Sequence, residues 1–377
     1  MNNINAEKRE HVFYFDYLRL IAAFCVVYMH VAASPLRNGI SLGWYFNDVL
    51  VSFSFCAVPL FFMMSGYLIL TSEKTADVTF LLKKRIPHLL VPLIFWSLFY
   101  AVYDNLISGG VNVKAILDLL KNCLFVPTEV HLWYIYTLIA LYIISPLLFG
   151  GVKLLEKKGR VYVFIILSSF TLISCINTVL SAFSIHTFDV DLFSKLEIFG
   201  GDLLIFLIGY FLGSTKIKIP NFVLIISSVL TLGIISAGTY FTTKAFGEYN
   251  QLFQNQHHGF EVLLAAELFL LFKQKFDKPL KIMKAIPIVP LSMPIYFSHL
   301  FFIYFSYRHG IINSGFKGTV IMSVAVFVIS FLFSKTVASV KPICFAVTGM
   351  KYKDACKTCN WIFTFNRIKN RVKQKNN

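Results

Sequence analysis

Charged side chains are scarce in this sequence of 377 residues. Asp, Glu, Lys and Arg make up 14% of the chain, hydrophobic residues make up 57%, and the mean hydropathy is +0.69. Ordinary soluble domains contain about 25% charged residues, so the composition excludes a typical soluble enzyme. The chain also has no internal repeat and no low-complexity tract. We therefore expect one all-α domain that resides in a lipid bilayer.

Cysteine is also scarce, with seven residues in the whole chain. Five of them are scattered in or beside apolar segments. Cys356 and Cys359 form one CxxC pair near the C-terminus, but a zinc site would need a second pair or two histidines. We therefore expect no metal site.

Apolar runs of about 20 residues, the length that crosses a hydrocarbon core, recur along the whole chain. They predict a polytopic membrane protein with ten transmembrane helices. The predicted spans are 12–33, 45–70, 88–107, 131–150, 161–181, 196–213, 220–242, 258–274, 286–307 and 317–340. Four prolines inside spans, Pro59, Pro92, Pro146 and Pro294, predict kinks or span edges.

The net charge of +16 follows the predicted topology and does not indicate nucleic-acid binding. With the N-terminus inside, the inner segments hold 27 of the 35 Lys and Arg residues and the outer loops hold seven, as the positive-inside rule requires. An even number of spans then places both termini in the cytoplasm. The sequence thus predicts a transmembrane domain over residues 1–342 and a basic cytoplasmic tail over 343–377, whose RIKNRVKQK run (367–375) lies near anionic lipid.

Arg19 and His30 lie within the first predicted span. On a helix, eleven residues place them about 20° apart around the axis and about 16 Å apart along it. Both side chains therefore face the same neighbour at different depths. Asp16 precedes Arg19 by one turn, at a spacing that allows an ion pair. Because an arginine in a span costs at least about 2.5 kcal/mol, this stripe needs a partner or a function.

Two interpretations of the stripe are open. One is an interfacial Asp16–Arg19 pair, with His30 as an anchor at the outer edge. The other is acyl transfer, in which a neutral imidazole accepts the proton of an attacking hydroxyl and a guanidinium holds phosphate or an oxyanion. A proton-coupled transporter or glycan exporter also uses intramembrane Asp, Arg and His, but many such carriers contain repeats.

The Arg19-x10-His30 spacing inside FDYLRLIAAFCVVYMH resembles the first-helix motif of the membrane acyltransferase 3 family of bacterial O-acyltransferases. Within that family, the sequence is most similar to the subgroup that O-acetylates enterobacterial common antigen. The likeness extends over nearly all ten spans. The other similar stretches, in the family's order, are VPLFFMMSGYLIL (58–70), KKRIPHLLVPLIFW (83–96), HLWYIYTLIALYIISPLL (131–148), FGGDLLIFLIGYFLG (199–213) and LSMPIYFSHLFFI (291–303).

The resemblance implies a multi-pass protein of the bacterial inner membrane. It would move an acetyl or similar small acyl group from acyl-CoA to a hydroxyl of a cell-surface glycan or its lipid-linked precursor. Acetyl-CoA is then the co-substrate, and the glycan acceptor and membrane lipids are the partners. The resemblance also implies that His30 is the base or acyl relay, with Arg19 and Asp16 as its companions, and it leaves direct transfer and a covalent acyl-enzyme both open.

Further residues match family motifs and have two readings each. Arg85 would contact a coenzyme phosphate or act as a positive-inside anchor. His131 and Trp133 would contact substrate, although Trp is also common at the membrane interface. His299 would take part in chemistry or would bond a backbone carbonyl. For Ser65 and Gly66 in the second-helix motif, a close helix–helix contact is favoured over direct chemistry.

Acidic residues inside predicted spans complete the set of candidates. Asp202 in the sixth span should meet a cation or a water cavity, and Arg19 or Arg85 is its candidate partner. Glu261 and Glu267 near the eighth span invite the same argument. The longest outer breaks, 108–130 and 243–257, are the predicted places to meet an extracytoplasmic substrate.

Overall fold

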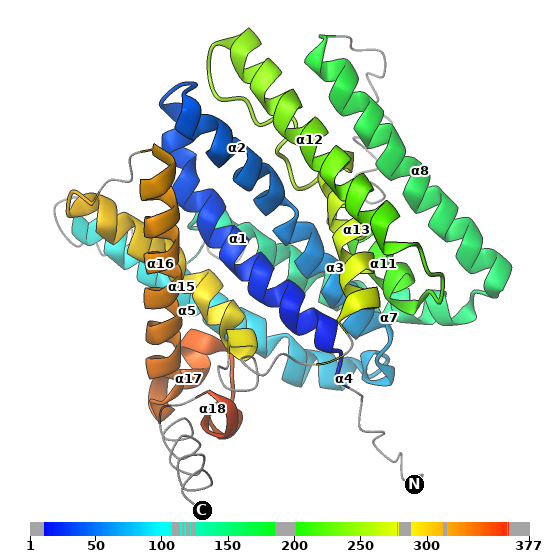
Figure 1. Cartoon of the computed structure of the whole chain (residues 1–377). Coiled ribbons are helices and arrows are strands. Elements are labelled where there is room, and N and C mark those ends of the chain that lie inside the picture. Colours follow the sequence, from blue (N-terminus) through cyan, green and yellow to red (C-terminus); the bar gives the residue numbers. More distant parts are fainter. Residues whose placement is uncertain are drawn as a thin grey trace, which may run out of the picture.

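The computed structural model describes residues 11–107, 126–184, 201–276, 288–311 and 315–359, together with Lys114, Leu117, Lys121, Lys278 and Trp361. Over these residues the regular structure is entirely helical, as the composition predicts. Figure 1 shows a bundle in which α1 runs through the middle.

The helices follow one another with short connections. In chain order they are α1 (Phe13–Arg37), α2 (Leu42–Phe55), α3 (Ala57–Leu70), η1 (Glu73–Thr75), α4 (Val78–Phe80), the π-helical turn η2 (Leu81–Arg85), α5 (Pro87–Ile107), η3 (Val130–Leu132), α7 (Trp133–Leu154), α8 (Lys157–Ala182), α11 (Asp202–Ser214), α12 (Asn221–Phe246), α13 (Gly259–Lys275), α15 (Ile288–Arg308), α16 (Gly315–Ala338), α17 (Lys341–Thr348) and α18 (Tyr352–Thr358).

Each of the ten predicted spans contains a helix, and within the described ranges eight helical segments are long and apolar enough to cross a bilayer. Two are shorter. α11 has 13 residues and α13 has 17, so they measure about 20 Å and 26 Å against a core of about 30 Å. The described part of 196–213 is therefore too short for a straight crossing, whereas α13 has the same length as the predicted span 258–274 and lies within one residue of it.

The second predicted span is broken into two helices. α2 ends at Phe55 and α3 starts at Ala57. Pro59 lacks the N–H that the carbonyl of Phe55 would accept in a continuous helix, and this explains the break. Pro92, Pro146 and Pro294 lie inside α5, α7 and α15.

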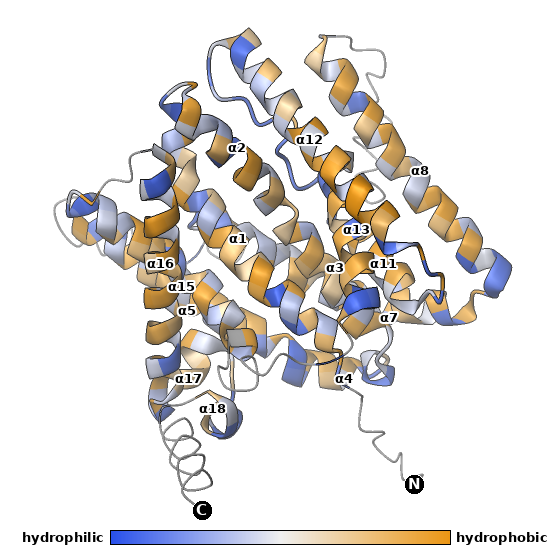
Figure 2. Cartoon of the chain, in the orientation of Figure 1, coloured by the Kyte–Doolittle hydropathy of each residue, from blue (hydrophilic) through white to orange (hydrophobic). Residues whose placement is uncertain are grey.

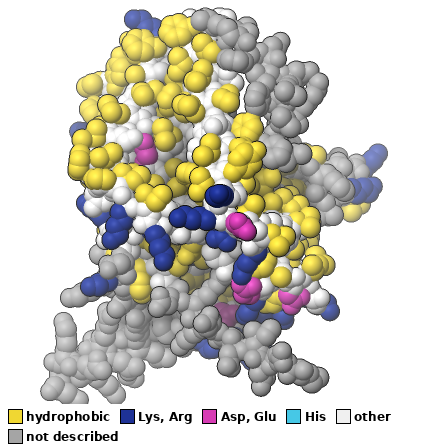
Figure 3. Space-filling model, turned by 90° about the vertical axis from the view of Figure 1, so that its right-hand side faces the viewer, with side chains coloured by type: hydrophobic (Ala, Val, Ile, Leu, Met, Phe, Trp, Pro, Cys, Tyr) yellow, Lys and Arg dark blue, Asp and Glu magenta, His cyan; other side chains and the backbone are white. Residues whose placement is uncertain are grey.

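The surface agrees with a membrane location. Most residues of α8 and α12 are hydrophobic, as their colours in Figure 2 show, and little of either helix is buried inside the bundle. In Figure 3 a band of Lys and Arg side chains crosses the lower half of the face shown, below a mostly apolar surface. α1 begins and α16 ends toward the lower side of the bundle (Figure 1), as an even number of crossings requires.

Helix α1 is the centre of the bundle, because it packs against α2, α3, α13, α15 and α16. Helices α3 and α11 pack closely against each other. A Cβ added to Gly66 would lie 1.8 Å from the carbonyl oxygen of Phe206, and one added to Gly209 would lie 2.1 Å from that of Met63. Only glycine allows the two backbones to approach this closely.

The segment after α16 packs onto the bundle. α17 contacts α5 and α16, and α18 contacts α17. The indole Nε1 of Trp96 on α5 donates to the carbonyl of Val347 at 3.0 Å. Residues 362–377, which include the predicted lipid-facing run, lie outside the described part of the chain.

Candidate active site

Three histidines from distant parts of the sequence form a cluster inside the bundle. His30 comes from α1, His131 from η3 and His299 from α15. The ring centroids are 5.1 Å apart for His30 and His299, 5.2 Å for His131 and His299, and 6.5 Å for His30 and His131. His131 and His299 are buried and His30 is half-buried. We call these three residues the histidine cluster.

The loop that carries His131 is fixed against α15. The Tyr296 hydroxyl donates to the carbonyl of His131, and the Tyr304 hydroxyl donates to the Glu129 carboxylate at 2.9 Å. Burial raises the pKa of the Glu129 carboxyl to about 6, although the bond from Tyr304 opposes this shift. The ring of Tyr100 on α5 packs edge-on against His131, with centroids 5.6 Å apart. These contacts hold the His131 ring in one place.

His299 has a defined tautomer. Its Nδ1 lies 2.6 Å from the carbonyl oxygen of Tyr296, and a carbonyl only accepts, so Nδ1 carries the hydrogen. Nε2 then carries a lone pair and acts as a hydrogen-bond acceptor. Neither this atom nor either ring nitrogen of His131 has a hydrogen-bond partner among the described residues. The cluster therefore presents buried acceptors that are available to a substrate.

Arg19 and Asp16 line a separate cavity of about 720 Å³ at the N-terminal end of α1. Lys273 and Tyr67 are also among its lining residues, and His30 is not. Asp16 Oδ2 accepts from His11 Nε2 at 2.6 Å. No ion pair joins Asp16 to Arg19 in the described part of the chain, so the predicted interfacial pair does not form.

Tyr134 on α7 lies between the cavity and the histidine cluster. It is within electrostatic reach of Arg19 and Asp202 and next to Ser65. Its ring packs against that of Tyr296 at 5.8 Å, and Tyr296 contacts His131 at 5.3 Å. Tyr134 therefore links the two parts of the predicted stripe, and it carries no signal in the sequence beyond its place in the 131–148 motif.

Arg85 lies in a turn at the same end of the bundle as the cavity. Its Nη1 donates to Thr75 Oγ1 at 2.8 Å and its Nη2 donates to Ser72 Oγ at 2.9 Å. The guanidinium also lies over the Phe80 ring, 5.6 Å from its centroid. Arg85 thus fastens the turn between α3 and α5.

Asp202 does not pair with Arg19 or Arg85, and that expectation is wrong. Its Oδ1 lies 3.1 Å from Nε2 of His257. The physical reason is that α11 begins at Asp202, so the carboxylate lies at a helix end and faces the connection between α12 and α13. Trp133 completes this group, with its ring centroid 5.3 Å from that of His257.

The remaining candidates have mainly structural contacts. Ser65 adjoins Gly66, which forms the α3–α11 contact that the sequence favoured. Glu267 accepts from Ser227 and Thr231 of α12. Glu261 is fully buried, and neither of its carboxylate oxygens has a partner within the described ranges.

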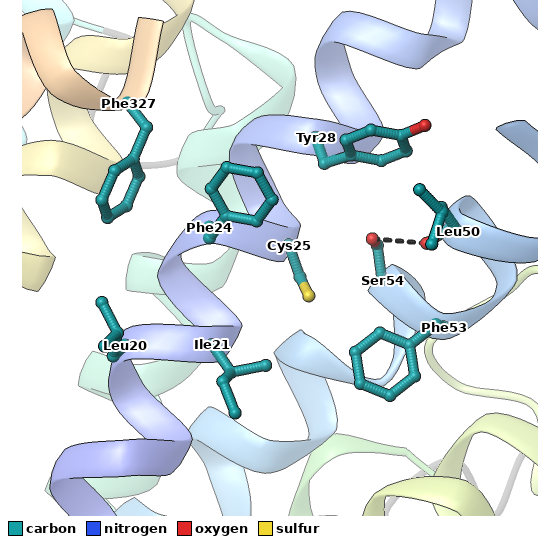
Figure 4. A pocket seen from close by; sticks show the side chains of 9 residues that line it. All are labelled: Leu20, Ile21, Phe24, Cys25, Tyr28, Leu50, Phe53, Ser54 and Phe327. Atoms are coloured by element: carbon teal, nitrogen blue, oxygen red, sulfur yellow. Dashed lines mark hydrogen bonds between the residues drawn. The ribbon is translucent and has the colours of Figure 1, made fainter. Parts of the chain in front are cut away.

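A second cavity, of about 380 Å³, lies beside α1 (Figure 4). It is lined mainly by apolar and aromatic side chains, including Phe24, Tyr28 and Phe327. Phe24 and Tyr28 project roughly 120–160° around α1 from His30. This cavity therefore has no access to the histidine cluster along that helix.

No group of three His, Cys, Asp or Glu side chains in the described part of the chain is arranged to hold a metal ion. Cys356 and Cys359 are free cysteines in and just after α18.

Comparison with known proteins agrees with the sequence motifs. The acyltransferase 3 family model, described as an acyltransferase domain, matches residues 12–337. The chain is similar to Nodulation protein 10 of Rhizobium leguminosarum bv. viciae, with 31% identity over 141 residues. The aligned part is 36% of this chain and 37% of that protein. No solved structure matches the chain.

Proposed function

Because the chain belongs to the acyltransferase 3 family, whose model covers residues 12–337, we propose that it moves an acetyl or similar small acyl group from acyl-CoA to a glycan hydroxyl. The acceptor is a cell-surface glycan or its lipid-linked precursor, and the enzyme resides in the bacterial inner membrane. The observation that carries the proposal is the histidine cluster, which lies on the same face of α1 as the Arg19 cavity.

The cavity at the start of α1 is the donor site in this proposal. Arg19 presents a planar guanidinium that pairs with phosphate, and no ion pair occupies it in the described part of the chain. Acetyl-CoA places its phosphates there, and its pantetheine arm carries the thioester toward Tyr134. Tyr134 then donates a hydrogen bond to the thioester carbonyl oxygen as negative charge develops on it.

The histidine cluster supplies the proton transfers. The acceptor oxygen attacks the thioester carbonyl carbon while its proton passes to His30. Nε2 of His299, which carries a lone pair, accepts a hydrogen bond from the His30 imidazolium. The carbon–sulfur bond then breaks, the coenzyme thiolate takes the proton from His30, and the ester remains on the glycan. In this order of steps the acyl group is never attached to the enzyme.

The direct test is mass spectrometry of surface glycans from cells with and without this protein. We expect an acetyl ester that is lost without the protein and is restored by the wild type. His309→Ala, which alters an exposed histidine at the end of α15, should also restore it, whereas His30→Ala should not. Identical acylation in both strains would exclude the proposed function. Assignment to the enterobacterial common antigen subgroup stays a prediction.

A further inference from the structure

The connection between α12 and α13 dips into the bundle. The two helices pack side by side, and Gln274 aligns their inner ends through hydrogen bonds with Ile219 and Asn221. α12 has 26 residues and α13 has 17, so α13 starts about 13 Å deeper than α12 ends. Residues 247–258 cover this depth as a hydrophilic segment that runs down beside α12 (Figure 2). We call 247–258 the re-entrant segment.

Buried hydrogen bonds fix the re-entrant segment. Gln254, which is 1% exposed, donates from Nε2 to Asp48 Oδ1 at 2.8 Å and to Ser52 Oγ at 2.9 Å. Ser236 on α12 donates to the other oxygen of Asp48. Phe253 packs so closely on α12 that a Cβ at Gly238 would lie 2.5 Å from its ring. The segment is therefore a built part of the fold.

His257 is partly exposed in this fixed segment. Its backbone N–H donates to Asn255 Oδ1 at 3.0 Å, and its ring pairs with Asp202. Even so, 38% of the His257 side chain is exposed, compared with 14% for Asp202. Trp133, whose ring packs against His257, is also partly exposed. The accessible surface below the end of α12 therefore includes an imidazole, an indole and, to a smaller extent, a carboxylate.

The chemistry of this group fits a sugar ring. The Asp202 carboxylate accepts from Nε2–H of His257, so Nδ1 is left as an acceptor for a hydroxyl. The indole of Trp133 offers a flat apolar surface for the C–H face of a pyranose. Trp133 packs against Tyr134 with ring centroids 6.4 Å apart. Tyr134 packs in turn against Tyr296, which contacts His131, so a series of ring contacts joins this group to the histidine cluster. Asp202 is the first residue of α11, where the helix dipole stabilises its negative charge.

We infer that the re-entrant segment forms the acceptor subsite, in which Trp133 packs against a sugar ring and Nδ1 of His257 accepts a hydrogen bond from one of its hydroxyls. Asp202 orients the His257 ring and does not itself need to touch the acceptor. The inference deepens the proposed function and rests on it for the identity of the acceptor as a glycan.

The test uses the full-length protein in lipid nanodiscs, radiolabelled acetyl-CoA, and surface glycan isolated from cells that lack the protein. Transfer is measured while each substrate is varied in turn. For His257→Ala we expect KM for the glycan to rise about tenfold and KM for acetyl-CoA to stay unchanged. His257→Gln, which keeps a side chain able to bond Asp202, should lie between wild type and His257→Ala. His309→Ala is the matched control and should change neither constant.

Binding of the labelled glycan to nanodiscs separates this inference from the proposed function. If the wild type transfers no acetyl but binds the glycan more tightly than His257→Ala does, the proposed function fails and the subsite stands. If His257→Ala binds and uses the glycan as the wild type does, the subsite is refuted, whatever the reaction. A rise in KM for acetyl-CoA alone would refute it too, because His257 would then serve the donor. Size-exclusion chromatography excludes misfolding of each variant.

Discussion

The contact between α3 and α11 gives a sharp prediction for Gly209→Ala. The new Cβ would lie 2.1 Å from the carbonyl oxygen of Met63 and 2.2 Å from its Cα. Ordinary contact begins near 3.4 Å, so the two helices must move apart by about 1.3 Å. Overpacking of this kind costs about 1–3 kcal/mol and sometimes more. α11 also positions Asp202, so transfer to the glycan should weaken together with stability.

Gly233→Ala is the matched control. Gly233 lies inside α12, and a Cβ there would have nothing within 4 Å. Replacing an interior helical glycine whose surroundings are open stabilises a helix by about 0.5–1 kcal/mol. The assay is unfolding of purified protein in mixed micelles with increasing dodecyl sulphate, followed by circular dichroism. Equal stability of Gly209→Ala and wild type, or an equal loss in both variants, would refute the packing argument.

Three further predictions concern the site. Tyr134→Phe should lower kcat about 10²-fold with little change in either KM, and an unchanged kcat would remove Tyr134 from the reaction. Arg19→Lys should raise KM for acetyl-CoA because an ammonium cannot bind phosphate in a planar, bidentate way; an unchanged KM would make Arg19 an anchor only. Burial raises the pKa of Glu129 from 4.5 to about 6, so the folded protein holds the carboxyl proton more tightly than the unfolded chain does. The stability that this provides is complete below pH 4.5 and is lost as pH rises through 6. Relative to Glu129→Gln, the wild type should therefore lose thermal stability across that range, and a constant difference would contradict the assignment.

Local sequence properties were sufficient for the helices and for the face of α1. Hydrophobic length predicted where helices lie, and the eleven-residue spacing predicted that Arg19 and His30 share a face. The family resemblance singled out His131 and His299, and both join His30 in the histidine cluster.

The partner of Asp202 could not be read from the sequence. Its distance from His257 depends on how deeply the re-entrant segment descends, and this depth is set by side-chain bonds such as Gln254 to Asp48. The re-entrant segment is rich in Asn, Gln and His, and this composition predicts a solvated loop. Sequence reasoning does not find Tyr134 for a similar reason. The position of its side chain in the site depends on neighbours from α1, α3 and α15 and not on the local sequence pattern. The roles of Arg19, His30 and the other site residues stay predictions.

The most direct measurement for the central claim is acetyl transfer by purified His30→Ala in nanodiscs, with labelled acetyl-CoA and the de-acetylated glycan. The account predicts that transfer falls about 10²–10⁴-fold, while binding of acetyl-CoA at the Arg19 cavity is unchanged. Transfer at the wild-type rate in a folded His30→Ala protein would contradict it.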